Sequence, residues 1–275
     1  MLRNRGLELQ STPPNRTATI CGAERAAKLA QAMRAILFDF GGTLDCPRHW
    51  LDRFVEHYRA AGIGLSRAEL EPAFTAATLA GYRASESIRN CGLRELIAFL
   101  VDKQMEFLRG QQQAKELGFL ANLQSPSMER EVKRRISDSF VEESASGLAR
   151  SRRVVSLLAN EFVVGVVSNF YGNLERILGD AGFGGIVTAV ADSGRLGVYK
   201  PDVGIYEAAL AMIGMPPRAT MMIGDSLDKD CAPARRLGMR AVWLRHAEAT
   251  SSGQAEADFT IDALEELEDL LCRKD

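Results

Sequence analysis

The chain has 275 residues, of which 46% are apolar and 25% charged, and its formal net charge is −2. This is the composition of a globular protein with room for one large domain or two smaller ones. A charge so close to zero provides neither the basic stripe that binds nucleic acid nor the basic cluster that binds membrane surfaces, so we expect neither partner. No apolar run in the sequence approaches the roughly 20 residues that span a bilayer.

The cysteines and the N-terminal segment indicate in which cellular compartment the protein is expected. The five cysteines, at positions 21, 46, 91, 231 and 272, are odd in number and widely spaced. Free thiols in a reducing compartment explain this better than a disulfide framework or a zinc site, so we expect a cytoplasmic protein. Residues 1–33 are rich in arginine and lack the continuous apolar stretch of a secretory signal. A transit peptide is one alternative; because Met33 directly precedes the first predicted strand, a disordered leader or an over-long start is favoured.

Six short apolar runs are predicted to be β-strands, and stretches with helical spacing separate most of them. Continuous apolar runs of this length indicate strands buried on both faces, as in a parallel sheet covered by helices. Strands that alternate with helices predict a doubly wound α/β domain with a mostly parallel sheet. The predicted strands are 35–38, 162–167, 186–191, 221–223, 241–244 and the weaker 259–261.

One interval interrupts this alternation. Residues 46–148 contain no convincing strand, which predicts an all-helical domain inserted after the first strand. The core is then formed by residues 34–45 and 149–275, and a separate helix at 148–160 leads back to the sheet. The helices expected within the insert are 50–61, 66–79, 93–108, 114–120 and 128–140.

Polar residues follow four of the predicted strands, at the edge where ligands bind in an open parallel sheet. Each feature alone is weak, because an Asp at the end of a strand usually caps a helix or a turn. Their occurrence together at one edge predicts a functional site. The residues are Asp39, Gly41, Gly42 and Thr43 after the first strand, Ser168 and Asn169 after the second, Lys200 after the third, and Asp225 and Asp230 after the fourth.

These residues fall in four motifs that resemble those of the haloacid dehalogenase-like hydrolase superfamily, over roughly residues 34–272. The helical insert between the first two motifs is similar to the C1-type cap of the family's phosphoglycolate-phosphatase-like branch. The motifs are I-L-F-D-F-G-G-T-L at 36–44, V-V-S-N at 166–169, S-G-R-L-G-V-Y-K-P-D at 193–202, and I-G-D-S at 223–226 followed by Asp230.

The resemblance implies a phosphatase-type hydrolase in which a carboxylate attacks phosphorus and forms an aspartyl-phosphate. It also implies Mg²⁺ bound by oxygen ligands. The implied roles are Asp39 as nucleophile; Asp39, the Gly41 carbonyl, Asp225 and Asp230 around the metal; Lys200 as the cation that steadies Asp39 and the phosphate; and Gly42, Thr43, Ser168 and Asn169 in contact with the phosphate.

Gly41 departs from the family pattern, because most family phosphatases read D-x-D-x-T and use the second Asp as general acid and base. The backbone carbonyl survives this change, but a positioned acid–base group is typically worth about 10²–10⁴-fold in rate. Anomeric, acyl or aryl phosphates can lose their leaving group without an acid. We therefore expect slow dephosphorylation and a restriction to activated substrates. Candidate substitute bases are Asp45, Cys46 and His49, for which packing in the linker or cap is the ordinary alternative.

Two other functions stay open. A 2-haloacid dehalogenase would attack carbon through Asp39 without an acid or a metal, but the acidic pair Asp225 and Asp230 favours Mg²⁺. A non-hydrolytic binding protein would explain Gly41, but not the retention of several buried like charges. The expected substrate is a small phosphorylated metabolite, bound by a monomer or homodimer. Candidates for specificity contacts in the cap are Arg48, Trp50, His57, Tyr58, Tyr82 and Arg83.

Overall fold

The computed structural model describes residues 32–110, 125–246 and 256–271. Within these residues the core is one six-stranded sheet, in which every strand pairs in parallel, in the order β3-β2-β1-β4-β5-β6. The predicted doubly wound α/β fold is thus confirmed. The strands are β1 (Ala35–Phe38), β2 (Val163–Ser168), β3 (Ala189–Asp192), β4 (Thr220–Gly224), β5 (Arg240–Leu244) and β6 (Phe259–Ile261).

The sheet is covered on both faces, as the continuous apolar strands require. Successive side chains of β1 point to opposite faces: Ile36 and Phe38 belong to one apolar cluster, and Ala35 and Leu37 to another. The first cluster packs against the C-terminal part of α7 (Pro126–Leu158), α8 (Leu174–Asp180) and α12 (Glu266–Leu271); the second packs against α10 (Val203–Ile213) and α11 (Ala232–Arg236). Short helices α9 (Ser193–Leu196) and η1 (Pro217–Ala219) lie in the connections.

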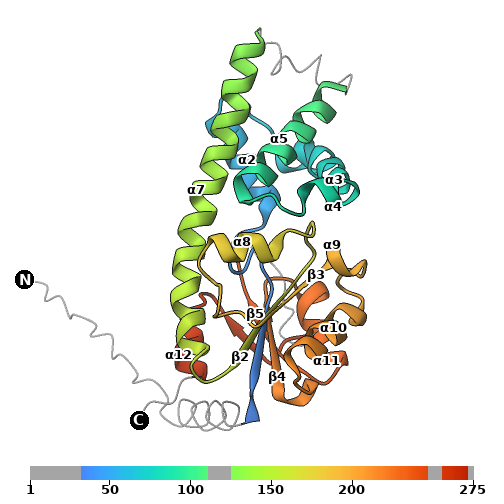
Figure 1. Cartoon of the computed structure of the whole chain (residues 1–275). Helices are drawn as coiled ribbons and strands as arrows, with labels where there is room; N and C mark the ends of the chain where they lie inside the picture. The colour runs from blue at the N-terminus through green and yellow to red at the C-terminus, as the bar shows by residue number, and fades with distance from the viewer. Residues whose placement is uncertain (1–31, 111–124, 247–255, 272–275) are drawn as a thin grey trace, which may run out of the picture.

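A helical unit lies beyond the carboxyl ends of the strands, above the sheet in Figure 1. It is formed by the residues between β1 and β2 and shares an apolar interior that includes Phe54, Leu100 and Phe140. The expected helix at 114–120 lies outside the described residues. The helices of this insert are α2 (Trp50–Ala60), α3 (Arg67–Arg83), α4 (Ser85–Ile88), α5 (Leu93–Gly110) and the first part of α7.

Helix α7 corrects the prediction of two separate helices at 128–140 and 148–160, because it runs unbroken for 33 residues. Small residues interrupt its apolar periodicity at the point where it crosses the loop after β1. A Cβ on Gly147 would lie 1.8 Å from the carbonyl oxygen of Asp45, and the Ser151 hydroxyl donates to the Leu44 carbonyl at 2.6 Å. These small residues serve close packing and do not end the helix. The boundary at residue 148 falls inside α7, so the division into two domains stays a prediction.

The described residues include only the end of the predicted N-terminal leader and three of the five cysteines. The predicted leader lies outside them up to residue 31, and the side chain of Met33 is buried. Cys46, Cys91 and Cys231 lie within the described residues and are free thiols. Among the described helices, none combines the length and the apolar character needed to cross a membrane.

Candidate active site

The centre of the sheet places two acidic residues side by side. Strands β1 and β4 are neighbours, and the chain turns outward in opposite directions from them, which opens a crevice at their carboxyl ends. Asp39 follows β1 and Asp225 follows β4. The backbone N–H of Asp39 donates to the carbonyl of Ile223 at 2.9 Å, which ties the start of the loop to β4. The sheet topology therefore brings together two carboxylates that are 186 positions apart in the chain.

Three carboxylates share this crevice with one buried ammonium group. Oxygen atoms of Asp39, Asp225 and Asp230 lie within 4.8 Å of one another. The Nζ of Lys200 lies 2.5 Å from Oδ1 of Asp39 and 2.6 Å from Oδ1 of Asp230. Burial and the neighbouring carboxylates raise the pKa of Asp225, whereas Asp230 and Asp39 raise the pKa of Lys200 against the effect of its burial. The cluster carries more negative charge than Lys200 neutralises, so it favours a further cation.

A π-helical turn, η2 (Leu227–Cys231), places Asp230 against the end of β4. The backbone N–H of Ser226 donates to Oδ2 of Asp230 at 3.0 Å. A Cβ on Gly224 would lie 2.4 Å from the Asp230 carboxyl, so glycine at the strand end permits this approach. Single π-turns of this kind are frequent at functional sites.

Gly42 shapes the loop between Asp39 and Asp225. Its φ of 87° lies in the left-handed region, and a Cβ there would lie 2.5 Å from Oδ2 of Asp225. Its N–H donates to Oδ1 of Asp45 at 2.9 Å, and its carbonyl lies 2.9 Å from Nε2 of His246. Both backbone groups of Gly42 are therefore engaged within the protein. Sequence reasoning missed His246, although it stands two residues beyond β5 and the rule that located the other residues applies to it.

The remaining predicted phosphate contacts surround Asp39 and Lys200. The hydroxyl of Ser168 donates to Oδ1 of Asp39 at 3.0 Å, and that of Thr43 donates to Oδ2 at 3.4 Å. The Asn169 side chain accepts from the backbone N–H of Lys200 at 2.7 Å and donates to its carbonyl at 3.0 Å. Asn169 thus positions the lysine.

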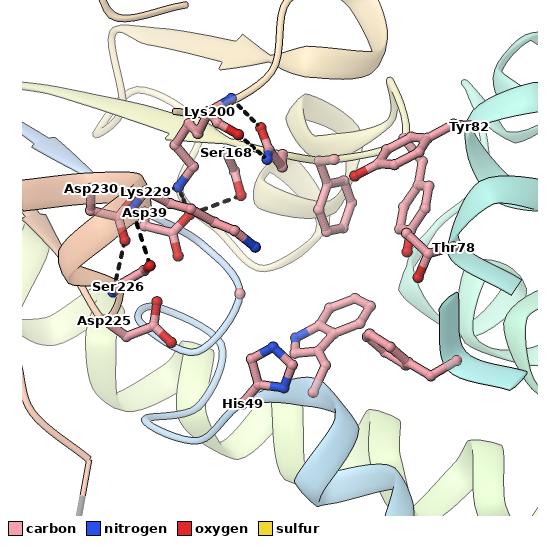
Figure 2. Close-up of a pocket in the computed structure, with 16 residues that line it drawn as sticks. Asp39, His49, Thr78, Tyr82, Ser168, Lys200, Asp225, Ser226, Lys229 and Asp230 are labelled. Atoms are coloured by element: carbon pink, nitrogen blue, oxygen red, sulfur yellow. Dashed lines mark hydrogen bonds and ion pairs between the residues drawn. The ribbon is translucent and has the colours of Figure 1, made fainter. Parts of the chain in front are cut away.

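A cavity of about 330 Å³ opens above this cluster, between the strand ends and the helical insert. Figure 2 shows Asp39, Ser168 and Lys200 on one side and Thr78 and Tyr82 on the other. Gly42 and Thr43 do not line it, whereas the other predicted site residues do. Lining residues that the sequence did not single out are Phe74, Thr78, Phe170, Tyr171, Ser226 and Lys229.

The three candidate substitute bases have different surroundings. Asp45 is buried, and its carboxylate accepts from Gly42, Trp50 and Arg53. Burial raises the pKa of Cys46 to about 11, so its thiol stays protonated. His49 lines the cavity, but its Nδ1 accepts from the Leu51 N–H at 3.2 Å and desolvation lowers its pKa. The Nδ1 lone pair is therefore already engaged by the backbone of α2.

Trp50 occupies the space beside Gly41. A Cβ on Gly41 would lie 3.3 Å from the indole Nε1, and other indole atoms lie within 3.8 Å. The same Nε1 donates to Oδ2 of Asp45 at 2.8 Å. The position of the family's second Asp is thus bordered by an aromatic ring whose N–H is already bonded.

Of the candidate specificity residues, two line the cavity and four do not. Trp50 and Tyr82 face it. Arg48 pairs with Glu56 and Glu143, and His57 bonds to Glu143 at 2.9 Å. Tyr58 is buried inside the insert, and Arg83 is exposed outside the cavity.

The sheet is doubly wound and parallel, and its crevice between β1 and β4, where the direction of the strand order reverses, holds several carboxylates and one lysine. This combination defines an α/β enzyme core. A family model described as haloacid dehalogenase-like hydrolase matches residues 33–238, and the chain belongs to this family. The resemblance inferred from the four motifs is therefore confirmed.

Sequence similarity to characterised relatives covers parts of the chain. It is 33% identical over 93 residues to phosphoserine phosphatase of Thermus thermophilus, which is 34% of this chain and 37% of that enzyme. It is 28% identical over 145 residues to pyrimidine 5'-nucleotidase YjjG of Escherichia coli, which is 50% of this chain and 64% of that enzyme. The alignments thus span less than two thirds of either relative.

A solved dehalogenase structure with an intermediate complex superposes with a TM-score of 0.57 and 17% identity, covering 88% of this chain and 99% of that one. At this identity the likeness concerns the fold alone.

Proposed function

We propose that the protein is a Mg²⁺-dependent phosphohydrolase that transfers a phosphoryl group to Asp39 and then to water. Its substrate is a small phosphorylated metabolite with a good leaving group. The observation that supports this most is the buried cluster of Asp39, Asp225 and Asp230 around a single Lys200.

The donor set fits Mg²⁺, which prefers oxygen ligands. Asp39, Asp225 and the carbonyl of Gly41 would hold the ion, and Asp230 would complete its surroundings. The excess negative charge supports the same conclusion, because a divalent cation would neutralise it. When bound, Mg²⁺ reduces the repulsion between the carboxylates and the phosphate and stabilises charge on the phosphoryl oxygens.

In the first step an oxygen of Asp39 attacks phosphorus and the bond to the leaving-group oxygen breaks. The leaving group departs with the electron pair, and Asp39 becomes an aspartyl-phosphate. Lys200 and Ser168, which hold Oδ1 of Asp39, fix the carboxylate for the attack. Because residue 41 is glycine, no side chain there protonates the leaving group, which favours acyl and aryl phosphates.

In the second step water attacks phosphorus, the bond between phosphorus and Asp39 breaks, and the protons of the water go to the released phosphate and to solvent. The Asp45 carboxylate already accepts from Gly42, Trp50 and Arg53, and Nδ1 of His49 accepts from Leu51, so the acceptor atoms of both candidate bases are already engaged. We expect this step to limit turnover.

Phosphate release from acetyl phosphate tests the proposal. Wild-type protein with Mg²⁺ should release phosphate, and EDTA or Asp39→Asn should abolish the release. If wild type and variant are equally inert with acetyl and aryl phosphates, yet both bind phosphorylated ligands, the protein is a binding module and the proposal is wrong.

The dehalogenase alternative is favoured by one observation, the missing acid at Gly41. The dehalogenase reaction does not explain why three carboxylates surround Lys200, because displacement of halide from carbon needs no metal cation. Halide release from 2-chloropropionate in the presence of EDTA would establish it in place of the phosphohydrolase.

A further inference from the structure

The side of the cavity that faces away from Lys200 is aromatic. Five of the sixteen lining residues are aromatic, whereas aromatic residues make up 7% of the chain. We call these five the aromatic wall: Trp50, Phe74 and Tyr82 from the helical insert, and Phe170 and Tyr171 from the loop after β2. Because the aromatic wall borders the same cavity as Asp39 and Lys200, it faces the part of the substrate that carries the phosphate.

Helix α3 presents one face to this cavity. Phe74, Thr78 and Tyr82 are spaced four residues apart, so they lie on the same side of the helix, and all three line the cavity. A Cβ on Gly81 would lie 2.7 Å from the ring of Tyr171. Glycine at this position therefore lets the loop after β2 approach α3, which joins the two parts of the wall.

Four of the five rings form a row of successive contacts from Tyr82 to Trp50, which borders Gly41. Centroids are 5.1 Å apart for Tyr82 and Tyr171, 5.2 Å for Tyr171 and Phe170, and 5.9 Å for Phe170 and Trp50. These separations suit aromatic contacts. The hydrogen-bonding group of Trp50 is bound to Asp45, so towards Gly41 this residue offers ring surface.

The wall carries no formal charge that would bind an acid. Among the described residues of the insert that line the cavity there is no Asp, Glu, Lys or Arg, and desolvation lowers the pKa of His49. A leaving group with its own carboxylate or phosphate would therefore meet no partner on this side. The cation Lys229 comes from η2 on the polar side.

We propose that the substrate is the phosphate ester of an aromatic hydroxyl, whose uncharged planar ring packs against the aromatic wall while its phosphate lies at Asp39. This rests on the proposed function and names the leaving group for it. Two independent features agree: the wall recognises a ring, and a phenolate can depart without the acid that Gly41 lacks. A phenol ionises near pH 10, far below an alkanol, so it needs less protonation as it leaves.

The first test separates ring recognition from leaving-group chemistry in the wild-type enzyme. Benzyl phosphate and cyclohexylmethyl phosphate have equally poor leaving groups and equal charge, but only the former is planar. We expect benzyl phosphate to inhibit acetyl phosphate hydrolysis about five- to tenfold more tightly, since aromatic pairing adds to area burial. Equal inhibition constants for the two esters would overturn the inference while leaving the proposed function intact.

The second test uses two substrates and matched variants. Phenyl phosphate carries the ring, and acetyl phosphate is activated without one. For Tyr82→Leu we expect the ratio of kcat/KM for phenyl phosphate to that for acetyl phosphate to fall about five- to tenfold. The control Phe99→Leu changes a partly buried ring of the same insert that does not line the cavity, and both substrates should be unaffected.

The outcomes distinguish the two proposals. If wild-type enzyme hydrolyses acetyl phosphate with Mg²⁺ but the ratio is unchanged in Tyr82→Leu, the aromatic substrate class is wrong. If wild-type enzyme hydrolyses neither substrate, the proposed function itself fails.

Discussion

The two sides of the cavity are built in different ways. The polar side consists of residues from the loops and turns that follow β1, β2, β3 and β4, so the order of the strands brings them to one edge of the sheet. The aromatic wall comes mainly from helices α2 and α3, whose positions depend on how the insert packs. One side is therefore determined mainly by the order of the strands, and the other by contacts between distant segments.

A buried ionic network joins the two sides. Arg53 of α2 pairs with Asp45 at 2.6 Å and with Glu143 of α7 at 2.9 Å. Asp45 in turn binds Gly42, which borders Asp225 of the polar side, and Trp50 of the aromatic wall. We infer that this network holds Trp50 beside Gly41.

The largest effect is expected at Asp39. Asp39→Asn removes the attacking oxygen's charge and one proposed metal ligand, so we expect at least about a 10³-fold loss of kcat with acetyl phosphate. Asp228→Asn makes the same chemical change at an exposed residue of η2 and should retain near wild-type activity. Phosphate-release assays compare the two; similar losses in both variants would refute the special role of Asp39.

The next effect concerns Gly42. Gly42→Ala adds a methyl group 2.5 Å from Oδ2 of Asp225 at a φ of 87°. We expect Asp225 to be displaced, with a loss of apparent Mg²⁺ affinity of about tenfold or more. Gly62→Ala is the matched control, since Gly62 has a φ of 89° and nothing within 4 Å of its Cβ position. Mg²⁺ titrations of activity that shift equally in both variants would show backbone strain alone to be responsible.

Gly41→Asp restores the second Asp of the family motif and tests whether Trp50 leaves room for it. In Gly41→Asp the new side chain meets the indole of Trp50, whose Nε1 lies 3.3 Å from the Cβ position. We therefore expect less than the roughly 10²-fold gain that a positioned acid gives with alkyl phosphates. Gly41→Ala reports the steric effect alone. A gain of about 10²-fold with benzyl phosphate in Gly41→Asp would show that Trp50 does not obstruct this position.

The smallest effect concerns the network. Burial would raise the pKa of Glu143, but the hydrogen bond from His57 and the charge of Arg53 hold it at about 2. Because this is below the ordinary value, ionised Glu143 stabilises the fold above about pH 5, and the stabilisation is lost as pH falls towards 2. Because solvent screens part of these interactions at the partly exposed carboxylate, we expect Glu143→Gln to lower the free energy of unfolding by about 1 kcal/mol at pH 7, and by less at pH 3.

Urea unfolding of both proteins at several pH values measures this difference. Glu142→Gln, an exposed neighbour on α7, should behave like the wild type. If the difference between wild type and Glu143→Gln stayed constant from pH 7 to pH 3, the pKa of Glu143 would not be displaced by its partners.

The polar side could be predicted from the sequence because it needs little more than strand order. Asp39, Ser168 and Asp225 lie at the ends of short apolar runs, and Lys200 and Asp230 lie in the segments that follow such runs. Parallel strands bring their carboxyl ends to one edge. The contacts of Asn169 with the backbone of Lys200 were not foreseeable, since they depend on the path of the loop after β3.

The aromatic wall and α7 could not be predicted in the same way. The spacing of Phe74, Thr78 and Tyr82 predicts one helix face. From the sequence alone, that face could equally well be packed in the interior of the insert as line a cavity. In α7 the small residues around Gly147 imitate the end of a helix. Their actual role, contact with the Asp45 carbonyl, depends on a segment about 100 positions away.

The central claim is that Asp39 is phosphorylated and then slowly hydrolysed, and rapid-quench kinetics test it most directly. With Mg²⁺ and an excess of 4-nitrophenyl phosphate, we expect a burst of nitrophenolate that approaches one equivalent per active site, followed by slower turnover. The burst should be absent in Asp39→Asn. Linear release from the first turnover, with equal rates for alkyl and aryl phosphates, would contradict the account.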